Sequence, residues 1–457
     1  MIRIDGQPIV TAEEMRAAEA QAIAGGTSVD GLMARAGEAV AEQVRRLAAG
    51  AEVLVACGPG NNGGDGYVIA AALKRGGHAV RVACFGEPGT AAAGAARTRW
   101  TGDVEPLADA RPAPVLVDAL FGVGLTRELD EGAAAPLRRL IEGARLSIAV
   151  DVPSGVSSDD GACLADLPPV DLTLAIGAAK PAHVLQPAAQ RCGAVRVLDI
   201  GVAVEGRVRV AKAPQLGTPP PNAHKYSRGL VAVVAGAMPG AAALSATAAA
   251  KGGAGYVLLL GSATDRLPHA VVRRRFSAEA LGDARVGAVV IGPGLGRDDK
   301  ACERLDAAFA CGRPLVVDGD ALHLLGDRRS DTPMIVTPHA GEFSAMFGDS
   351  GGSKIARATD AARRLGAVVV FKGADTVIAA PDGRAVVHPD GTAWLATAGT
   401  GDVLAGIIGA RLAAGTQAFD AAAQGVWLHA EAARRAGRSF IADDLADRLP
   451  AAIGACL

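Results

Sequence analysis

The chain has 457 residues, of which 50% are hydrophobic and only 3% aromatic, and its 46 basic and 48 acidic side chains give a formal net charge of −2. This length allows two or three domains, and the high apolar and glycine content favours a folded α/β protein over a disordered chain. The balanced charge and the few aromatic rings argue against a nucleic-acid partner, which would need a basic surface or stacking platforms.

Short β-rich runs alternate with helical stretches through the first half of the chain. The sequence Thr11-Ala-Glu-Glu14 predicts a capping box at the start of a first helix. A second helix follows, with apolar residues at helical spacing: Leu32, Ala36, Val40, Val44 and Leu47. We expect strands at residues 53–57, 80–85, 115–119, 147–150, 172–176 and 195–200. This alternation predicts βαβ units, in which helices cover both faces of a mostly parallel sheet.

Prolines interrupt this pattern between Gly201 and Ser227, where Pro214 and the run Pro219-Pro-Pro221 lie. We place the boundary between two domains in this stretch, because compact domains are joined by such segments. A second alternating series follows, with strands expected at residues 230–235, 256–260, 288–291, 315–317, 334–336, 368–371 and 377–380. The sequence therefore predicts one α/β domain at residues 1–210 and another at residues 215–457.

No segment predicts secretion or membrane insertion. The N-terminus carries Arg3 and Asp5 instead of an apolar core, and Arg411 interrupts the most apolar run. The seven cysteines show no CxxC spacing, and their odd number argues against a disulfide framework. We therefore expect a cytoplasmic protein without a membrane partner. Its thiols should be reduced and mostly buried, and Cys57 should be the cysteine nearest a predicted site.

A glycine-dense segment, Gly58-Pro-Gly-Asn-Asn-Gly-Gly-Asp-Gly66, follows the first buried strand and precedes a helix that we expect to begin near Tyr67. Such a loop at the carboxyl end of a strand is where doubly wound folds bind phosphorylated ligands. The alternative interpretation is a purely structural turn.

Aspartates close two further strands of the first half. Asp118 precedes Phe121-Gly-Val-Gly-Leu-Thr126, and Asp151 precedes Pro153-Ser154-Gly155. Because the carboxyl ends of parallel strands meet at one edge of a sheet, we expect these residues and the glycine-dense segment to form one crevice. Oxygen ligands without His or Cys suit an alkali or alkaline-earth cation rather than zinc. Taken singly, each aspartate could instead cap a helix or anchor a loop.

In the second half, Gly399-Thr-Gly-Asp402 stands directly before a long apolar stretch at residues 403–414. Its glycines allow a sharp turn whose N–H groups cradle an oxyanion, and a helix that began here would favour phosphate at its N-terminus. Asp402, in the first turn, would then accept the proton of a hydroxyl group that attacks this phosphate. The alternative is a glycine turn in which Asp402 only caps the helix.

Three other strand ends accompany this segment: Gly292-Pro-Gly-Leu-Gly296, Thr337-Pro-His-Ala-Gly-Glu342 and Lys372-Gly-Ala-Asp-Thr376. We expect the second to open a helix and the third to form a tight turn between strands. Of the eight histidines, only His339 lies in such a loop beside glycine, where a structural and a functional role are equally open. Lys372 would either face a phosphate or cap its turn, and we favour the cap.

The motifs of the first half resemble the NAD(P)H-hydrate epimerase family over about residues 1–205. The resemblance implies a Rossmann-like three-layer αβα fold that interconverts the (R) and (S) hydrates of NADH and NADPH. It also implies that K⁺ is coordinated by Asn62, Asp118 and Ser154. The hydrated dinucleotide would contact Asn61, Asn62, Gly63, Gly64, Asp65, Gly122, Val123, Gly124, Leu125, Thr126, Arg127, Glu128 and Asp151. We expect Asp151 to transfer the proton at the epimerising centre.

The motifs of the second half resemble the ribokinase-like superfamily over about residues 215–455, and most closely its NAD(P)H-hydrate dehydratase branch. Thr-Pro-His-x-Gly-Glu and Lys-Gly-x-x-Thr distinguish that branch from sugar and vitamin kinases. The resemblance implies a ribokinase-like αβα domain that uses Mg²⁺, with ADP as phosphoryl donor. The hydrated cofactor would contact Ala241, Gly294, His339 and Asp402. The adenine nucleotide would contact Lys372, Gly373, Ala374, Asp375, Thr376 and Gly401.

Both resemblances imply repair of NADHX and NADPHX, in which the (R) and (S) forms are epimerised and the (S) form is dehydrated at the expense of ADP, giving AMP and phosphate. The alternative is a ribokinase-like vitamin or sugar kinase fused to a Rossmann-like binding module. Where the family usually has Asn-Pro-Gly, this chain has Thr392-Ala-Trp394. We therefore expect this chain to differ from the family in the shape of this loop and in nucleotide selectivity. We also expect a homo-oligomer, although no sequence pattern specifies its interface.

Overall fold

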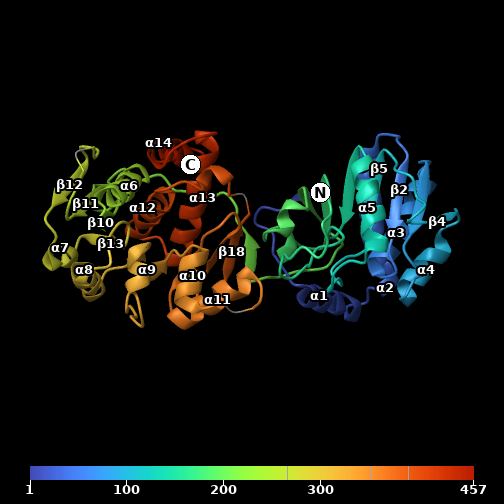
Figure 1. Cartoon of the computed structure of the whole chain (residues 1–457), viewed down its shortest axis with the longest axis horizontal. Helices are drawn as coiled ribbons and strands as arrows, with labels where there is room; N and C mark the ends of the chain where they lie inside the picture. The colour runs from blue at the N-terminus through green and yellow to red at the C-terminus, as the bar shows by residue number, and fades with distance from the viewer. Residues whose placement is uncertain (265, 350, 390) are drawn as a thin grey trace. The chain divides into compact units, whose positions relative to one another are not determined.

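The computed structural model describes residues 1–264, 266–349, 351–389 and 391–457. The chain divides into two compact units, Met1–Val210 and Ala211–Leu457, each built on a sheet with helices around it (Figure 1). Most neighbouring strands in both sheets are parallel. The α/β fold class predicted from the alternating runs is therefore confirmed.

The first unit contains a sheet in the order β1-β8-β7-β6-β5-β2-β3-β4, in which β1 alone is antiparallel to its neighbour. Its strands are β1 (Ile2–Arg3), β2 (Val53–Cys57), β3 (Val80–Cys84), β4 (Val104–Pro106), β5 (Val115–Ala119), β6 (Leu146–Val150), β7 (Leu172–Ile176) and β8 (Ala194–Leu198), and the short β9 (Val208–Val210) ends the unit. The chain runs outward from β2 to β4 and then returns to β5 on the other side of β2. This reversal is a topological switch point, where doubly wound sheets open a crevice at the carboxyl ends of their strands.

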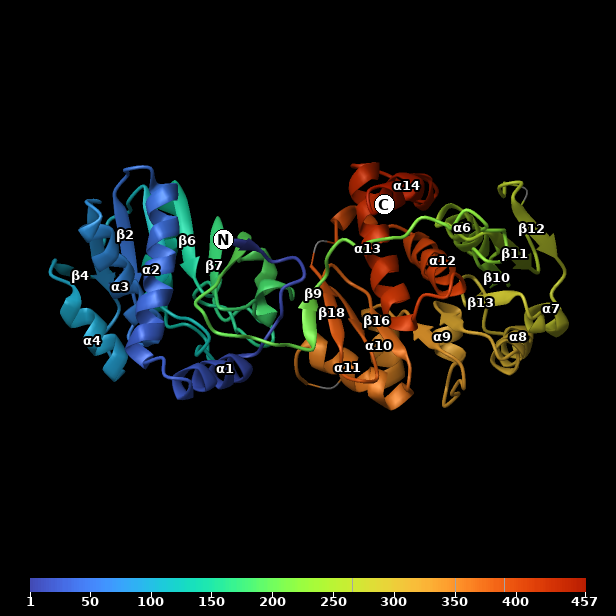
Figure 2. The ribbon, with the colours of Figure 1, turned by 180° about the vertical axis from the view of Figure 1, so that it is seen from behind.

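Helices cover both faces of this sheet. The opposite views place α2 (Val29–Ala48) and α3 (Asn61–Arg75) on one face and α5 (Glu131–Gly143) on the other (Figures 1 and 2). Alternate residues of β2 accordingly point into two different cores, one shared with α2 and α3 and one with α5. Every residue of β2 and β5 is buried for this reason. The other helical segments are α1 (Ala12–Ala24), α4 (Ala91–Arg99), η1 (Pro181–His183) and η2 (Ala188–Gln190).

The first two helices largely follow the sequence predictions. Thr11 and Glu14 form the expected capping box at the start of α1. The predicted apolar stripe of α2 is buried up to Val44, but Leu47 is 37% exposed. The prediction for Leu47 is wrong because the buried stripe continues four residues after Val44, at Ala48.

The second unit contains strands in the order β12-β11-β10-β13-β14-β15-β16-β17-β18. They are β10 (Leu230–Val234), β11 (Tyr256–Leu260), β12 (Val271–Arg274), β13 (Val286–Ile291), β14 (Leu315–Val317), β15 (Met334–Val336), β16 (Val368–Phe371), β17 (Thr376–Ala379) and β18 (Ala385–His388). The strands from β12 to β16 are parallel, and β16, β17 and β18 form an antiparallel meander. Here the switch point lies between β10 and β13.

The helices of the second unit gather on two sides of its sheet (Figures 1 and 2). On one side lie α6 (Pro239–Lys251), α12 (Thr400–Ala413), α13 (Ala418–Ala436) and α14 (Ala442–Gly454). On the other lie α8 (Asp299–Ala310), α9 (Asp320–Leu324), α10 (Ala340–Phe347) and α11 (Lys354–Leu365). The shorter segments are α7 (Ala278–Gly282) and η3 (Ala393–Leu395). Among the described residues, no helix combines the length and the apolar character that a membrane span requires.

Candidate functional site

A cavity of 590 Å³ lies at the switch point of the first unit, where the carboxyl ends of β2, β5, β6 and β7 meet. The strand ends that we expected to form one crevice therefore do lie together. Of the predicted site residues, its walls include Asn61, Asn62, Asp65, Gly122, Val123, Gly124, Leu125, Thr126, Arg127 and Asp151. The predicted contacts Gly63, Gly64 and Glu128 do not belong to the lining, and α1 and α2 complete the wall with residues such as Met15 and Leu32.

The glycine-dense segment is helical for most of its length, which corrects the prediction of a loop. Helix α3 begins at Asn61 rather than near Tyr67. The glycines are required by close packing: a Cβ on Gly63 would lie 1.8 Å from the carbonyl oxygen of Gly58, and one on Gly66 would lie within 2.9 Å of two side chains. The helix thus sits directly against its sheet, and its unpaired N–H groups open toward the cavity.

Asp118 and Ser154 are joined by hydrogen bonds just beneath this cavity. Asp118 is 1% exposed, and its carboxylate accepts from Ser154 Oγ (2.7 Å), Ser154 N (2.9 Å) and Leu120 N (3.2 Å). Burial raises the pKa of Asp118, against the lowering effect of these hydrogen bonds. Nearby, the Asn62 side chain packs against Gly122, and its buried amide nitrogen finds no hydrogen-bond partner among the described residues.

Asp151 has a left-handed backbone with φ of +66°, which is rare for a residue that has a side chain. Hydrogen bonds hold it in this conformation on several sides. Its N–H donates to Leu174 O (2.9 Å), its carbonyl oxygen accepts from His183 Nε2 (2.7 Å), and its Oδ1 accepts from Ile176 N (2.9 Å). The same Oδ1 forms an ion pair with the ammonium group of Lys180.

His183 links the backbones of these two charged residues. Its Nδ1 accepts from Lys180 N (2.9 Å), so that Nε2 carries the hydrogen donated to the carbonyl oxygen of Asp151. Burial, together with the positive charge of Lys180, lowers the pKa of His183 to about 4. The ring is therefore neutral near pH 7, in the tautomer that both hydrogen bonds require.

Two further carboxyl groups, Glu19 and Asp65, line the same cavity. Burial raises the pKa of both, and the negative charge of Asp151 adds to this, although the positive charge of Lys180 opposes it at Glu19. The pKa of Asp65 lies well above its ordinary range. The cavity therefore combines the Lys180–Asp151 ion pair with two carboxyl groups whose pKa burial raises, which is a setting for proton transfer.

At the switch point of the second unit, glycines let three strand ends approach closely. A Cβ on Gly236, after β10, would lie 2.1 Å from the carbonyl oxygen of Leu295. Gly292, after β13, has φ of +120°, and its Cβ would lie 1.6 Å from the carbonyl oxygen of Asp318. Because no other residue fits these positions, the backbone N–H groups of both loops can face one ligand.

The predicted substrate contacts Ala241 and Gly294 lie side by side at this point. Gly294 has φ of +60°, and a Cβ there would meet the Cβ of Ala241 at 2.9 Å. A ligand beside one of them would therefore also meet the other.

Helix α12 begins at Thr400, so the helix start that the phosphate-binding interpretation requires is present, and Gly399 is its N-cap with φ of +88°. Asp402 stands in the first turn and is not the cap residue, so the alternative of a simple cap does not hold. Burial and the negative charge of Asp318 raise the pKa of Asp402 to about 7, although the positive charge of Lys372 opposes them. A carboxyl with this pKa can both take up and release a proton near neutral pH.

Lys372 points toward the start of α12. Its Nζ donates to Asp318 Oδ1 (2.8 Å), lies 3.8 Å from Glu342 Oε2, and would lie 3.4 Å from a Cβ on Gly401. The favoured prediction, that Lys372 caps its own turn, is therefore wrong. Asp318, which is 2% exposed, also accepts a hydrogen bond from Thr337 Oγ1 (2.6 Å). These contacts fix the charges that surround Asp402.

The turn at residues 372–376 joins the antiparallel strands β16 and β17, as predicted. Thr376 Oγ1 accepts from Gly373 N (3.2 Å) and donates to Gly373 O (2.8 Å). The buried Asp375 forms an ion pair with Lys354 Nζ at 2.6 Å. The turn is thus rigid, and its shape does not depend on the ammonium group of Lys372.

His339 is the N-cap of α10, the helix that we expected this motif to open. Its ring nitrogen Nδ1 accepts hydrogen bonds from Gly341 N (3.0 Å) and Glu342 N (3.3 Å). The backbone N–H of His339 donates to Glu342 Oε2 (2.8 Å). One ring nitrogen is thus structural. The side chain is 61% exposed, so that Nε2 remains accessible to a ligand as well as to Glu342 Oε1 at 3.5 Å.

The segment that departs from the family pattern forms the short helix η3. Trp394 within it is 46% exposed. Thr400 Oγ1 donates to the carbonyl oxygens of Leu395 (2.9 Å) and Thr397 (3.0 Å), which connects this segment to the start of α12. The segment Thr392-Ala-Trp394 is thus held directly ahead of the glycine turn and Asp402.

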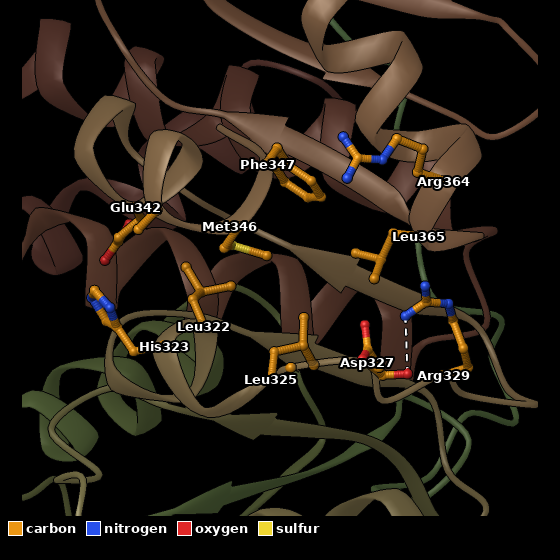
Figure 3. A pocket seen from close by; sticks show the side chains of 12 residues that line it. Leu322, His323, Leu325, Asp327, Arg329, Glu342, Met346, Phe347, Arg364 and Leu365 are labelled. Carbon is orange, nitrogen blue, oxygen red and sulfur yellow. Dashed lines mark hydrogen bonds between the residues drawn. The ribbon is translucent and has the colours of Figure 1, made fainter. Parts of the chain in front are cut away.

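A second cavity, of 310 Å³, lies between α9, α10 and the end of α11 (Figure 3). Apolar side chains form its floor, with Arg329 and Arg364 at one end and His323 and Glu342 at the other. Its lining includes none of the predicted site residues. Charges of both signs face it, so its chemistry favours no particular class of ligand.

Sequence reasoning missed Lys180, His183, Asp318 and Lys354. Asp318 directly follows β14 and could have been found by the rule that singled out Asp118. Lys180 and His183 stand in the apolar sequence after β7, where a lone charged residue is the available signal. Lys354 carried no local signal, because its partner Asp375 lies 21 residues further along the chain.

Comparison with known proteins gives matches to both halves of the chain. A family model described as NAD(P)H-hydrate dehydratase matches residues 231–454, and one described as YjeF-related protein N-terminus matches residues 29–182. The bifunctional NAD(P)H-hydrate repair enzyme of Salinibacter ruber is 33% identical, over 97% of this chain and 95% of its own length. The Mycobacterium tuberculosis protein of the same name is 35% identical, over 90% of each chain. Among solved structures, the ADP/ATP-dependent NAD(P)H-hydrate dehydratase from Bacillus subtilis, co-crystallised with ATP and Mg²⁺, is 29% identical with a TM-score of 0.48, covering 53% of this chain and 95% of that one.

Proposed function

The chain belongs to the family of bifunctional NAD(P)H-hydrate repair enzymes, and on this premise we propose that its two domains divide the repair between them. The domain at residues 1–210 interconverts the (R) and (S) epimers of NADHX and NADPHX. The domain at residues 215–457 converts the (S) epimer to NADH or NADPH at the expense of ADP, and it releases AMP and phosphate.

The chemistry of the substrate defines what each site must do. The reduced nicotinamide ring is an enamine, which takes a proton on the carbon β to the ring nitrogen and then adds water at the carbon next to that nitrogen. The hydrated ring therefore has a stereocentre bonded to both oxygen and nitrogen. Epimerisation must break and remake one bond at this centre, and dehydration must remove its hydroxyl group.

The setting of Asp402 is the observation that carries the dehydratase proposal. Asp402 accepts the proton of the substrate hydroxyl as its oxygen attacks the β-phosphorus of ADP, and AMP leaves. The ring nitrogen lone pair then expels phosphate, and loss of the proton on the neighbouring carbon restores the dihydronicotinamide. The N–H groups at the start of α12 stabilise charge on the transferring phosphoryl group. A pKa of about 7 suits a base that must be ionised near neutral pH.

The predicted contacts fit around this reaction. Ala241 and Gly294, which adjoin each other, form one wall for the hydrated ring, and the accessible Nε2 of His339 adds a polar group. The adenine nucleotide lies along the turn at residues 372–376 and against Gly401. Lys372 can move from Asp318 to a phosphate oxygen, because its ammonium group already lies beside Gly401.

Mg²⁺ neutralises charge on the transferring phosphoryl group when it is bound. Asp318 fits as a protein ligand, since carboxylate oxygen is a hard donor that Mg²⁺ prefers. Its Oδ1 is occupied by Lys372 and Thr337, whereas its Oδ2 lies toward the start of α12, 4.0 Å from a Cβ on Gly401. Nucleotide phosphates would supply further ligands.

K⁺ fits the oxygen-rich cluster of Asn62, Asp118 and Ser154 in the first domain. The supporting observation is the buried Asn62 amide, whose nitrogen has no partner among the described residues. Amide nitrogen and oxygen exchange places by a simple flip, and the flipped amide would offer its oxygen to a cation. Asp118 and Ser154 are already oriented by their mutual hydrogen bonds.

The products of a single turnover test the dehydratase proposal. With purified (S)-NADHX, ADP and Mg²⁺, we expect NADH, AMP and inorganic phosphate in equal amounts, measured by absorbance, chromatography and a phosphate assay. A small-molecule kinase would instead release a stable phosphate ester without inorganic phosphate, and that result would contradict the proposal.

A further inference from the structure

Lys180 is one of the largest fully buried side chains of the first domain, with 1% of its surface exposed. Its ammonium group has three N–H donors. One donates to Asp151 Oδ1 and another to Ile176 O, at 2.7 Å. Lys180 also belongs to the wall of the 590 Å³ cavity, together with Asp151. Its remaining N–H is therefore available to a group inside that cavity.

A contribution to folding stability does not explain why Lys180 and Asp151 form a buried ion pair. Taking two charges out of water costs about as much as their attraction returns, and well-packed apolar residues often replace such pairs without loss of stability. Here the pair is also accompanied by a strained backbone at Asp151 and by the His183 bridge between both residues. Strain that hydrogen bonds hold in place beside a cavity is typical of functional sites.

We propose that Lys180 is a second catalytic residue of the epimerase site and acts as the proton donor to the departing hydroxyl group of the hydrated ring. This inference rests on the proposed epimerase function. It assigns a catalytic role to Lys180, which lies outside the sequence motifs that indicated the epimerase. The Lys180 ammonium protonates the hydroxyl oxygen, the C–O bond breaks, and the ring nitrogen lone pair forms a C=N bond. Water leaves, and Lys180 becomes a neutral amine.

Asp151 completes the cycle. Water adds to the opposite face of the planar carbon, and the Asp151 carboxylate accepts the proton that the water loses. The protonated Asp151 then returns a proton to the Lys180 amine through the hydrogen bond between Oδ1 and Nζ. The sum of these steps inverts the stereocentre, and it consumes no co-reactant.

The test uses the full chain and pure (R)-NADHX with ADP and Mg²⁺, so that NADH forms only after epimerisation. We expect Lys180→Met to lower kcat of epimerisation by about 100-fold or more while KM changes little, which is the size of a lost general acid. Lys74→Met is the matched control, because Lys74 lies on α3 over the ring of Trp100, outside the cavity. It should match the wild type.

Chemical rescue separates proton transfer from a structural role. Lys180→Ala leaves space for a small amine, and we expect ethylamine and its more acidic fluorinated analogues to restore epimerisation at rates that depend on amine acidity. Such rescue also shows that the site is folded. Absence of rescue in a variant with a native circular dichroism spectrum would overturn the proposal, as would a Lys180→Met enzyme with kcat close to that of the wild type.

An oxygen label tests the bond that breaks. In H₂¹⁸O without ADP, each wild-type epimerisation should place ¹⁸O in the hydroxyl group, as mass spectrometry of the recovered hydrate would show. Retention of the original oxygen would mean that the ring C–N bond opens instead, and Lys180 would not be the donor to a departing hydroxyl. A wild-type chain that does not convert (R)-NADHX at all would contradict the epimerase function itself.

Discussion

At the scale of single residues, the pKa of Asp402 is raised to about 7 by burial and by the charge of Asp318. Asp402 must be ionised to accept a proton. We therefore expect kcat/KM of dehydration to fall tenfold per pH unit below about pH 7, since this parameter follows the ionisation of the free enzyme. The measurement is the rate with (S)-NADHX and ADP across this range. Asp402→Asn should lose the pH dependence together with most of the activity.

Asp402→Asn, which should lower the activity, should raise the thermal stability of the folded protein at alkaline pH. The folded-state pKa of Asp402 exceeds its ordinary value of 3.8, so the stability associated with its protonated form is complete below that value and is lost as pH rises through about 7. Asn is uncharged at every pH. Asp402→Asn should therefore have a higher Tm than the wild type at pH 8, with the difference vanishing near pH 4. A lower Tm for the variant at pH 8 would contradict this account of Asp402.

The direction of a side chain was the feature that sequence predicted least well. Asp402 could be placed because the glycine turn and the apolar run after it define a helix start. Lys372 could not, because its orientation depends on Asp318, which lies 54 residues away in the chain. Lys180 escaped notice for the same reason, since its partner Asp151 lies 29 residues away.

At the scale of elements, strands buried on both faces were predicted best. Continuous apolar runs located β2, β5, β7, β11, β14, β15 and β16 to the residue. The strands β1, β4, β9, β12 and β18 were missed, because each is short and contains a charged residue, a proline or a histidine, so that no continuous apolar run marks it. The start of α3 was misjudged, because glycine is usually a helix breaker and here serves close packing.

The start of α3, the end of β5 and the segment after β6 together support one prediction about K⁺. Asn62, Asp118 and Ser154 come from three segments that the switch point brings together. We expect replacement of K⁺ by the smaller Na⁺ to lower the epimerisation rate, because a smaller ion contacts the same oxygens less well. The rate with (R)-NADHX should be measured in both salts.

Dehydration of (S)-NADHX in the same two salts is the internal control, since its site lies in the other domain. Equal epimerisation rates in K⁺ and Na⁺ would remove the support for a K⁺ site. Asn62→Ala should show the low rate in both salts.

At the scale of the whole molecule, the two units share one architectural feature, a reversal of strand order in the sheet. Each has a mostly parallel sheet whose strand order reverses once, and in each several of the predicted residues lie at the carboxyl ends of strands beside that reversal. The residues at the two reversals differ: the first has the Lys180–Asp151 ion pair, which we propose transfers protons, and the second has a helix start with Asp402, which we propose serves phosphoryl transfer. One chain can therefore return both epimers of a damaged cofactor to use.

The most direct test of this account is the recovery of NADH from a mixture of both NADHX epimers by the purified chain with ADP and Mg²⁺. We predict that absorbance at the NADH maximum returns for the whole mixture, and that Asp151→Ala stops after the (S) form is consumed while Asp402→Asn recovers almost none. Complete recovery by the Asp151 variant at the wild-type rate, or recovery of the (S) form alone by the wild type, would contradict the division of labour between the two domains.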